Sequence, residues 1–123
     1  MLKLIDMDPN TAIQDQLAAA TPGPVVLINL ISVAAVEADT LATAWADDAA
    51  YFKRQPGFIS AQLHRGVGAS SMFMNYAVWE SVAAFAAAFG NTEFQRKLAA
   101  YPDSTVASPH LFQKTAVANI CLA

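Results

Sequence analysis

The spacing of hydrophobic positions changes several times along the chain, and each change marks a new element. Residues 25–31 are apolar on both faces except at Asn29 and are rich in β-branched side chains, which predicts a central strand covered on both sides. Residues 58–65 and 72–80 alternate as strands do and flank a glycine-containing turn, which predicts a hairpin. Residues 111–122 are β-branched and alternate in places, which predicts the last strand.

Three segments between these strands have the spacing or the end signals of helices. Apolar residues of 36–54 recur at helical intervals, and the adjacent carboxylates Asp47 and Asp48 predict a solvated face. Residues 81–89 are rich in alanine, and 91–100 predict a shorter helix. The order strand, helix, strand, strand, helix, strand predicts an α+β, ferredoxin-like split βαβ fold, with a four-stranded antiparallel sheet and helices on one face.

A further helix is predicted before this core. Asp8 suits its N-cap, Pro9 suits its first position, and helix-forming residues continue to Ala20. The 123 residues suffice for one domain. We therefore expect a single domain, with 1–23 as an N-terminal helical extension and 24–122 as the ferredoxin-like core.

The composition adds a second expectation, because this chain is short of charge. Charged residues make up 14% of it and hydrophobic residues 55%, whereas globular domains average about 25% charged residues. Either apolar surface is hidden in a subunit interface or a ligand cavity, or the many alanines raise the hydrophobic count without adding to the core. Since the predicted strands are apolar on both faces, we expect a second copy to cover the open face in a homodimer.

Several functional classes lack support in the sequence. Seven Lys and Arg against ten Asp and Glu leave no basic surface for nucleic acid. No apolar run is long enough to span a bilayer and no export signal is recognisable, so we expect a cytoplasmic protein that does not bind membranes. A single cysteine, Cys121, and no paired histidines argue against a metal site. No nucleotide, flavin or nicotinamide motif occurs, so no cofactor is expected.

Polar side chains inside apolar strands are the candidate functional residues, because burial of an unpartnered amide or imidazole costs a few kcal/mol. Asn29 lies in the first predicted strand, and His64 and His110 lie in or next to others. Asn75 and Trp79 are four residues apart on one strand face, where an amide donor and a flat indole can orient a planar aromatic ligand. For each residue alone, a hydrogen-bonded structural role is the simpler interpretation.

Three motifs, PGF at 56–58, LHR at 63–65 and NYxxWES at 75–81, carry a resemblance to a known family. QPGFISAQLHR at 55–65 and NYAVWES at 75–81, followed by Ala84-Phe85 and Thr92-Glu93-Phe94, resemble the antibiotic biosynthesis monooxygenase (ABM) family over about residues 25–120. The motifs are specific for the family and far less so for a substrate. The resemblance implies that ferredoxin-like chains pair into a dimeric α+β barrel, which agrees with the homodimer expected from the strands.

One activity that the resemblance implies is cofactor-independent oxidation of a polycyclic phenol or anthrone to a quinone by O₂. Asn75, Trp79 and His64 match family pocket residues by position, Arg96 is matched to an arginine, and Phe85 stands where the family has Tyr. In this interpretation Asn75 donates to a substrate oxygen, Trp79 stacks on the rings, His64 is the general base and Arg96 holds the enolate. Further substrate-binding residues are expected to be Asn29, Tyr76, Phe85 and Phe89.

Two alternatives to this oxygenase remain open. Haem degradation, the other activity known in such domains, is matched by Asn29, but Ala88 and Leu98 stand where the family has Trp and an axial His, so the iron would lack its protein ligand. The second alternative is a dimer without catalysis that binds small apolar ligands or is associated with stress, because a family fold alone does not fix a function.

Overall fold

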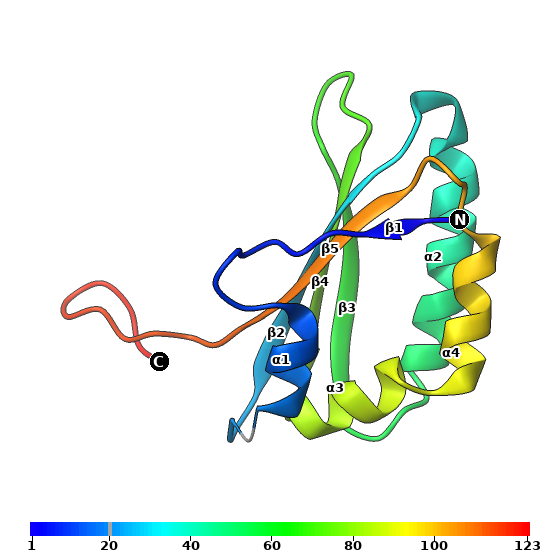
Figure 1. The fold of residues 1–123 in the computed structure, drawn as a ribbon. Helices are drawn as coiled ribbons and strands as arrows, with labels where there is room; N and C mark the ends of the chain where they lie inside the picture. The colour runs from blue at the N-terminus through cyan, green and yellow to red at the C-terminus, as the bar shows by residue number, and fades with distance from the viewer. Residues whose placement is uncertain (20) are drawn as a thin grey trace.

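The computed structural model describes residues 1–19 and 21–123 and contains one five-stranded sheet in the order β1-β5-β2-β4-β3 (Figure 1). Strands β2 to β5 pair antiparallel in the ferredoxin-like order, so the predicted α+β class is confirmed. The sheet is mixed, because β1 adds a short parallel partner to β5 that the sequence did not predict. The strands are β1 (Lys3–Leu4), β2 (Val25–Ser32), β3 (Phe58–Arg65), β4 (Met72–Trp79) and β5 (Val106–Phe112).

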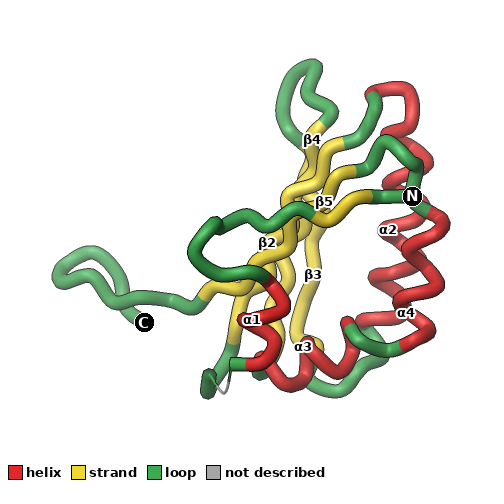
Figure 2. The backbone as a smooth tube through the Cα atoms, viewed as in Figure 1, coloured by secondary structure: helices red, strands yellow, loops and turns green. Residues whose placement is uncertain are grey.

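Helices α2 and α4 lie to one side of the main strands (Figure 2). Helices α2 and α4 stand side by side, α3 follows β4 and contacts α4, and α1 packs at the β5 edge against α3. None of the helices among residues 1–19 and 21–123 is long and apolar enough to cross a membrane. The helices are α1 (Ile13–Ala18), α2 (Ala38–Phe52), α3 (Val82–Phe89) and α4 (Thr92–Lys97), with the 3-10 turns η1 (Ala35–Glu37) and η2 (Leu98–Ala100).

The N-terminal helix is shorter than predicted. Asp8 does not cap it, because its Oδ1 accepts a hydrogen bond from the backbone N–H of Asn10 at 2.8 Å and closes a local turn instead. The helix begins at Ile13, and its N-cap Ala12 offers no side-chain bond. The predicted last residue, Ala20, lies outside the described residues.

The last strand lies earlier than the predicted range of 111–122, and only two residues are shared. Strand β5 includes Pro109, which interrupts the apolar pattern, and it pairs along β2 as far as the match between Val26 and Phe112. Because β2 begins only one residue before Val26, it offers residues 113–123 no partner. They run away from the sheet (Figure 1), and a bridge between Val117 and Cys121 closes a turn there.

The residues of the PGF and WES segments fix α3 against the end of β4. Gly57 has a φ of +84°, and a Cβ there would lie 2.4 Å from the Cβ of Ala84, so a side chain would clash with α3. The backbone N–H of Glu80 donates to the carbonyl of Gly57 at 2.8 Å. Ser81 caps α3 by accepting from the N–H of Ala84 at 3.1 Å. The helix therefore packs directly beside Trp79, the last residue of β4.

Two buried apolar clusters fill the space between the sheet and the helices. One cluster surrounds Trp79 and Phe85 at the α3 end, and the other surrounds Leu41 and Phe73 at the opposite end. The side of the sheet that packs on these clusters is called the covered face below. The opposite side, here called the open face, carries alternate residues of the two central strands: Val26, Ile28, Leu30, Met72, Met74, Tyr76 and Val78.

Candidate active site

Two asparagines meet at the middle of the covered face. Asn29 on β2 and Asn75 on β4 are directly paired in the antiparallel register, so their side chains lie next to each other on one face. Both line the same cavity. Their Oδ1 atoms are buried and have no hydrogen-bond partner within the described part of the chain. Since an unpartnered buried polar atom costs roughly 1–3 kcal/mol, a pair of them indicates a place for a polar ligand group.

The cavity lies between the sheet and the helices and draws residues from both apolar clusters. Its volume is about 70 Å³, and because roughly 10–15 Å³ of such volume holds one water, it has room for several waters. Trp45, Phe52 and Phe89 line it and are only partly buried. The cavity as it stands is therefore smaller than a planar molecule of several rings.

Aromatic rings form one wall of the cavity. Trp79 is 1% exposed, and the centroid of its ring lies 5.7 Å from that of Phe52 and 5.4 Å from that of Phe58, both nearly perpendicular. Phe85 lies 5.5 Å from Trp79 and 5.4 Å from Phe89. Three of these contacts are edge-on and that of Phe85 with Phe89 is tilted, so the wall is apolar and aromatic and suits a flat aromatic ligand better than a polar one.

Asp48 supplies the polar group on the helix side, which corrects the expectation of a solvated face. Asp48 is 4% exposed, because it follows the buried Leu41 by seven residues and so shares its face of α2. Its neighbour Asp47 does point outward and pairs with Lys97 at 2.8 Å. The OH of Tyr101 donates to Oδ2 of Asp48 at 2.5 Å.

Burial sets the proton affinity of this pair. Removal from water raises the pKa of Asp48 to about 6, the Tyr101 hydrogen bond and Lys97 lower it, and Asp47 raises it. The pKa of Tyr101 is raised by its burial and by the Asp48 charge. Asp48 Oδ1 and the nearby Thr105 Oγ1 are buried without a hydrogen-bond partner in the ranges that the structure describes.

Five of the eight predicted site residues come together at this cavity. They are Asn29, Asn75, Trp79, Phe85 and Phe89.

His64 and Tyr76 are the two predicted strand residues that the structure places elsewhere. Tyr76 is the residue after Asn75 on β4, and Met74 is the residue before Asn75. His64 on β3 pairs with Met74. Successive strand residues point to opposite faces, so both side chains lie on the open face. His64 is exposed, and its Nδ1 lies 3.1 Å from the carbonyl oxygen of Gln62.

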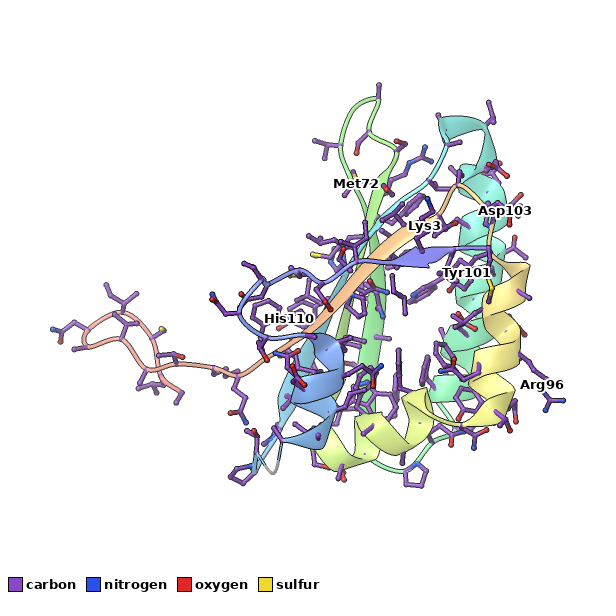
Figure 3. All side chains as sticks on the ribbon, in the orientation of Figure 1. Lys3, Met72, Arg96, Tyr101, Asp103 and His110 are labelled. Carbon is purple, nitrogen blue, oxygen red and sulfur yellow. The ribbon has the colours of Figure 1, made fainter. Side chains whose placement is uncertain are left out.

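Arg96 is the third predicted residue outside the cavity. Helix α4 buries Phe94, and a residue two positions later is turned roughly 200° around the helix axis. The side chain of Arg96 consequently extends away from the molecule (Figure 3).

His110, singled out in the sequence, lies within β5 and has a structural environment. It pairs with Ile28, which places it off the covered face. The N-terminal segment covers it, with Gln16 Nε2 at 3.1 Å and Asp8 Oδ2 at 4.0 Å from its Nε2. Gln16 also pairs with both backbone groups of Leu111, so it serves as an edge partner for β5.

A comparison of the sequence with models of known protein families agrees with this fold. The model of the family "antibiotic biosynthesis monooxygenase" matches residues 24–100, more than half of the chain. The chain belongs to the ABM family. The expected ABM monooxygenase is thereby confirmed at the level of the family, and the matched range contains all eight predicted site residues.

Crystal structures of similar proteins support the fold of this ABM chain. SnoaB, a cofactor-independent oxygenase from Streptomyces nogalater, is 26% identical, with a TM-score of 0.67 over 79% of this chain and 98% of that chain. A candidate monooxygenase from Shewanella loihica PV-4 is 25% identical, with a TM-score of 0.68 over 80% and 100%. A candidate antibiotic biosynthesis monooxygenase from Caulobacter crescentus CB15 is 19% identical, with a TM-score of 0.66 over 77% and 92%. No curated protein matches the sequence.

The two positions discussed for haem degradation offer no iron ligand in this ABM chain. Ala88 is buried in α3, and Leu98 lines the cavity with an aliphatic side chain. Neither of the two histidines is among the described residues that line the cavity. No group of three or more His, Cys, Asp or Glu side chains in residues 1–19 and 21–123 is arranged to hold a metal.

Three polar cavity residues were missed in the sequence: Asp48, Tyr101 and Thr105. For Asp48 a signal existed, because its seven-residue spacing from Leu41 places it on the buried face of the helix. Tyr101 and Thr105 lie in the irregular segment before β5, where no periodic pattern indicates which side chains point inward.

Proposed function

We propose that the protein is a cofactor-independent monooxygenase that oxidises a polycyclic phenol or anthrone to a quinone with O₂. The observation that carries this proposal is the unpartnered amide pair Asn29 and Asn75 within an aromatic-walled cavity. Membership of the ABM family supports it, as does the similarity to SnoaB, which is itself a cofactor-independent oxygenase.

The reaction balances without an added reductant. An anthrone methylene and O₂ give a carbonyl and one water, so the four electrons that reduce O₂ all come from the substrate. Loss of a proton first makes the electron-rich enolate that transfers electrons to O₂. The tasks left to the protein are to orient the rings, to stabilise the enolate oxygen and to accept the proton.

The covered face offers groups for the first two tasks. The amides of Asn29 and Asn75 offer both kinds of group: their unpartnered Oδ1 atoms accept from a substrate hydroxyl, and their Nδ2 groups donate to the enolate oxygen or to a peroxide formed on the substrate. Trp79 and Phe85 flank the aromatic rings of the substrate and orient them. Because Phe85 has no hydroxyl where the resemblance places a Tyr, stabilisation of the anion rests on the two amides.

The proposal includes a homodimer formed through the open face. Leu30, Met72 and Tyr76 on this face are 38%, 43% and 41% exposed in the single chain, and burial of such apolar surface favours association. We expect wild-type protein to sediment as a dimer at micromolar concentration and Leu30→Glu as a monomer. Val36→Glu is the matched control, because Val36 is 94% exposed in the turn before α2. A monomeric wild type would contradict the dimer.

The activity is tested by aerobic incubation of metal-free protein with dithranol, an anthrone, while O₂ uptake and quinone absorbance are followed. We expect wild-type turnover above the protein-free rate and a roughly 10- to 100-fold lower kcat for Asn75→Ala, since loss of one oriented donor costs up to about 10³ in rate. Val36→Ala is the control, because Val36 is 94% exposed in the turn before α2. If dithranol binds to the wild type but is not oxidised by it, the protein is a ligand-binding dimer without this activity.

A further inference from the structure

The helix side of the cavity contains a hydrogen-bond acceptor, the carboxylate of Asp48, to which the proposed role of the amide pair assigns no function. Among the described lining residues, Asp48 is the one carboxyl group and Tyr101 the one other titratable side chain. Asp48 comes from α2 and Tyr101 from the segment after α4, whereas Asn29 and Asn75 come from the sheet. The cavity therefore has polar groups on two opposite walls, with the aromatic wall between them.

The two carboxylate oxygens of Asp48 have different environments. Oδ2 accepts the hydrogen bond of Tyr101, which fixes the orientation of the carboxylate. Oδ1 is buried and has no partner within the described residues. A link between α2 and Tyr101 needs only Oδ2, so a purely structural role leaves the cost of the desolvated Oδ1 unexplained.

We propose that Asp48 Oδ1 accepts the hydroxyl hydrogen of an aromatic ligand and, resting on the function proposed above, removes that proton during catalysis. The O–H bond of the substrate breaks, an O–H bond to Asp48 Oδ1 forms, and the electron pair stays on the substrate as the enolate. The substrate class is thereby narrowed to aromatics that carry a hydroxyl group, or the enol of an anthrone, on the edge that faces α2. The opposite edge of the ligand, where O₂ adds, then faces Asn29 and Asn75, so in this orientation the two amides act on the peroxide and not on the enolate oxygen.

The charges around Asp48 suit this role. Burial holds its pKa near 6, so the carboxylate is mostly ionised at neutral pH yet is a stronger base than an exposed aspartate. Asp47 on α2, Lys97 on α4 and Tyr101 are the titratable groups that act on it. The groups that line the cavity from the sheet side are neutral, so no other charge competes for the proton.

Three variants test the role through the pH dependence of kcat/KM for dithranol oxidation. We expect the wild-type value to fall below about pH 6. Asp48→Asn should lower kcat/KM by roughly 100-fold or more and abolish this acid limb, because a general base contributes about 10²–10⁴. Tyr101→Phe should move the limb to higher pH, since its hydrogen bond lowers the pKa of Asp48, and Asp47→Asn should move it to lower pH with an unchanged plateau.

A binding experiment separates this inference from the proposed activity. We measure the Kd of 1,8-dihydroxyanthraquinone, the oxidised form of dithranol, by tryptophan fluorescence in wild type and Asp48→Asn. Weaker binding below about pH 6 in the wild type alone supports the acceptor role even if dithranol is not turned over. A folded Asp48→Asn protein that keeps the wild-type pH profile of binding overturns the inference, whether or not the oxygenase activity exists.

Discussion

The covered and open faces of the sheet are built from the same strands, but they differ in how polar groups are treated. On the covered face, Asn29 and Asn75 are surrounded by apolar side chains, and their oxygens lack partners among the described residues. On the open face, His64 and Gln62 reach solvent beside exposed apolar residues such as Tyr76. Polar groups that are costly to bury therefore occur where a ligand can satisfy them, and apolar groups that are costly to expose occur where a second chain can cover them.

The largest expected difference between the faces is in stability. Phe85→Ala removes a side chain that is 1% exposed, and such a truncation costs about 3–5 kcal/mol. Tyr76→Ala on the open face should cost less, and its cost should grow with protein concentration if the proposed homodimer covers this face. Urea denaturation at two protein concentrations measures both effects. Equal, concentration-independent losses would remove the distinction between the faces.

The next effect concerns the free energy of unfolding near neutral pH. The pKa of Asp48 is raised from 3.8 to about 6 in the folded chain, so the folded state binds more protons and stability falls as pH rises through this window. At pH 8 the ionised carboxylate costs about 3 kcal/mol, from 1.4 kcal/mol per pKa unit. Asp48→Asn should therefore be more stable than wild type at pH 8.

The same comparison at low pH supplies the control. Below about pH 4, where Asp48 is protonated in both states, the advantage of Asp48→Asn should vanish. Asp47→Asn should change stability by less than about 1 kcal/mol, because Asp47 is 61% exposed and solvent screens its ion pair with Lys97. An Asp48→Asn protein that is less stable than wild type at pH 8 would show that burial of the ionised carboxylate does not destabilise the folded state.

The smallest effect is expected for His64→Ala. The family resemblance predicts a general base at this position, whereas the structure places the exposed imidazole on the face away from the cavity. We expect kcat for dithranol to change less than about threefold, well below the 10²-fold contribution of a general base. A loss of 100-fold would show that the open face takes part in the chemistry.

Three of the strands could be predicted because the spacing of apolar residues along each segment indicates them. The alternation of 58–65 and 72–80 and the apolar run at 25–31 give the three strands to within one residue. The last strand was placed wrongly because the sequence pattern of 113–123 is typical of a strand, but β2 offers these residues no partner. Strand pairing depends on neighbours that are distant in sequence, and Pro109 concealed the segment that does pair.

The site was predictable where one strand carried the whole pattern and not where several elements meet. Asn75 and Trp79 are four residues apart on β4, so their shared face follows from the alternation. His64 was grouped with them through the resemblance, although the register places it on the other face. Tyr101 contacts Asp48, which lies 53 positions earlier in the sequence, and no local sequence pattern predicts such a contact.

The central claim is that the ligand binds at the covered face, and an NMR titration tests it most directly. 1,8-Dihydroxyanthraquinone is added to ¹⁵N-labelled protein, and the side-chain amide signals of Asn29, Asn75 and Gln62 are followed with the indole N–H of Trp79. We predict that the signals of Asn29, Asn75 and Trp79 shift together with one Kd, while that of Gln62 stays in place. A saturable shift of Gln62 with unmoved Asn29 and Asn75 signals would contradict the account.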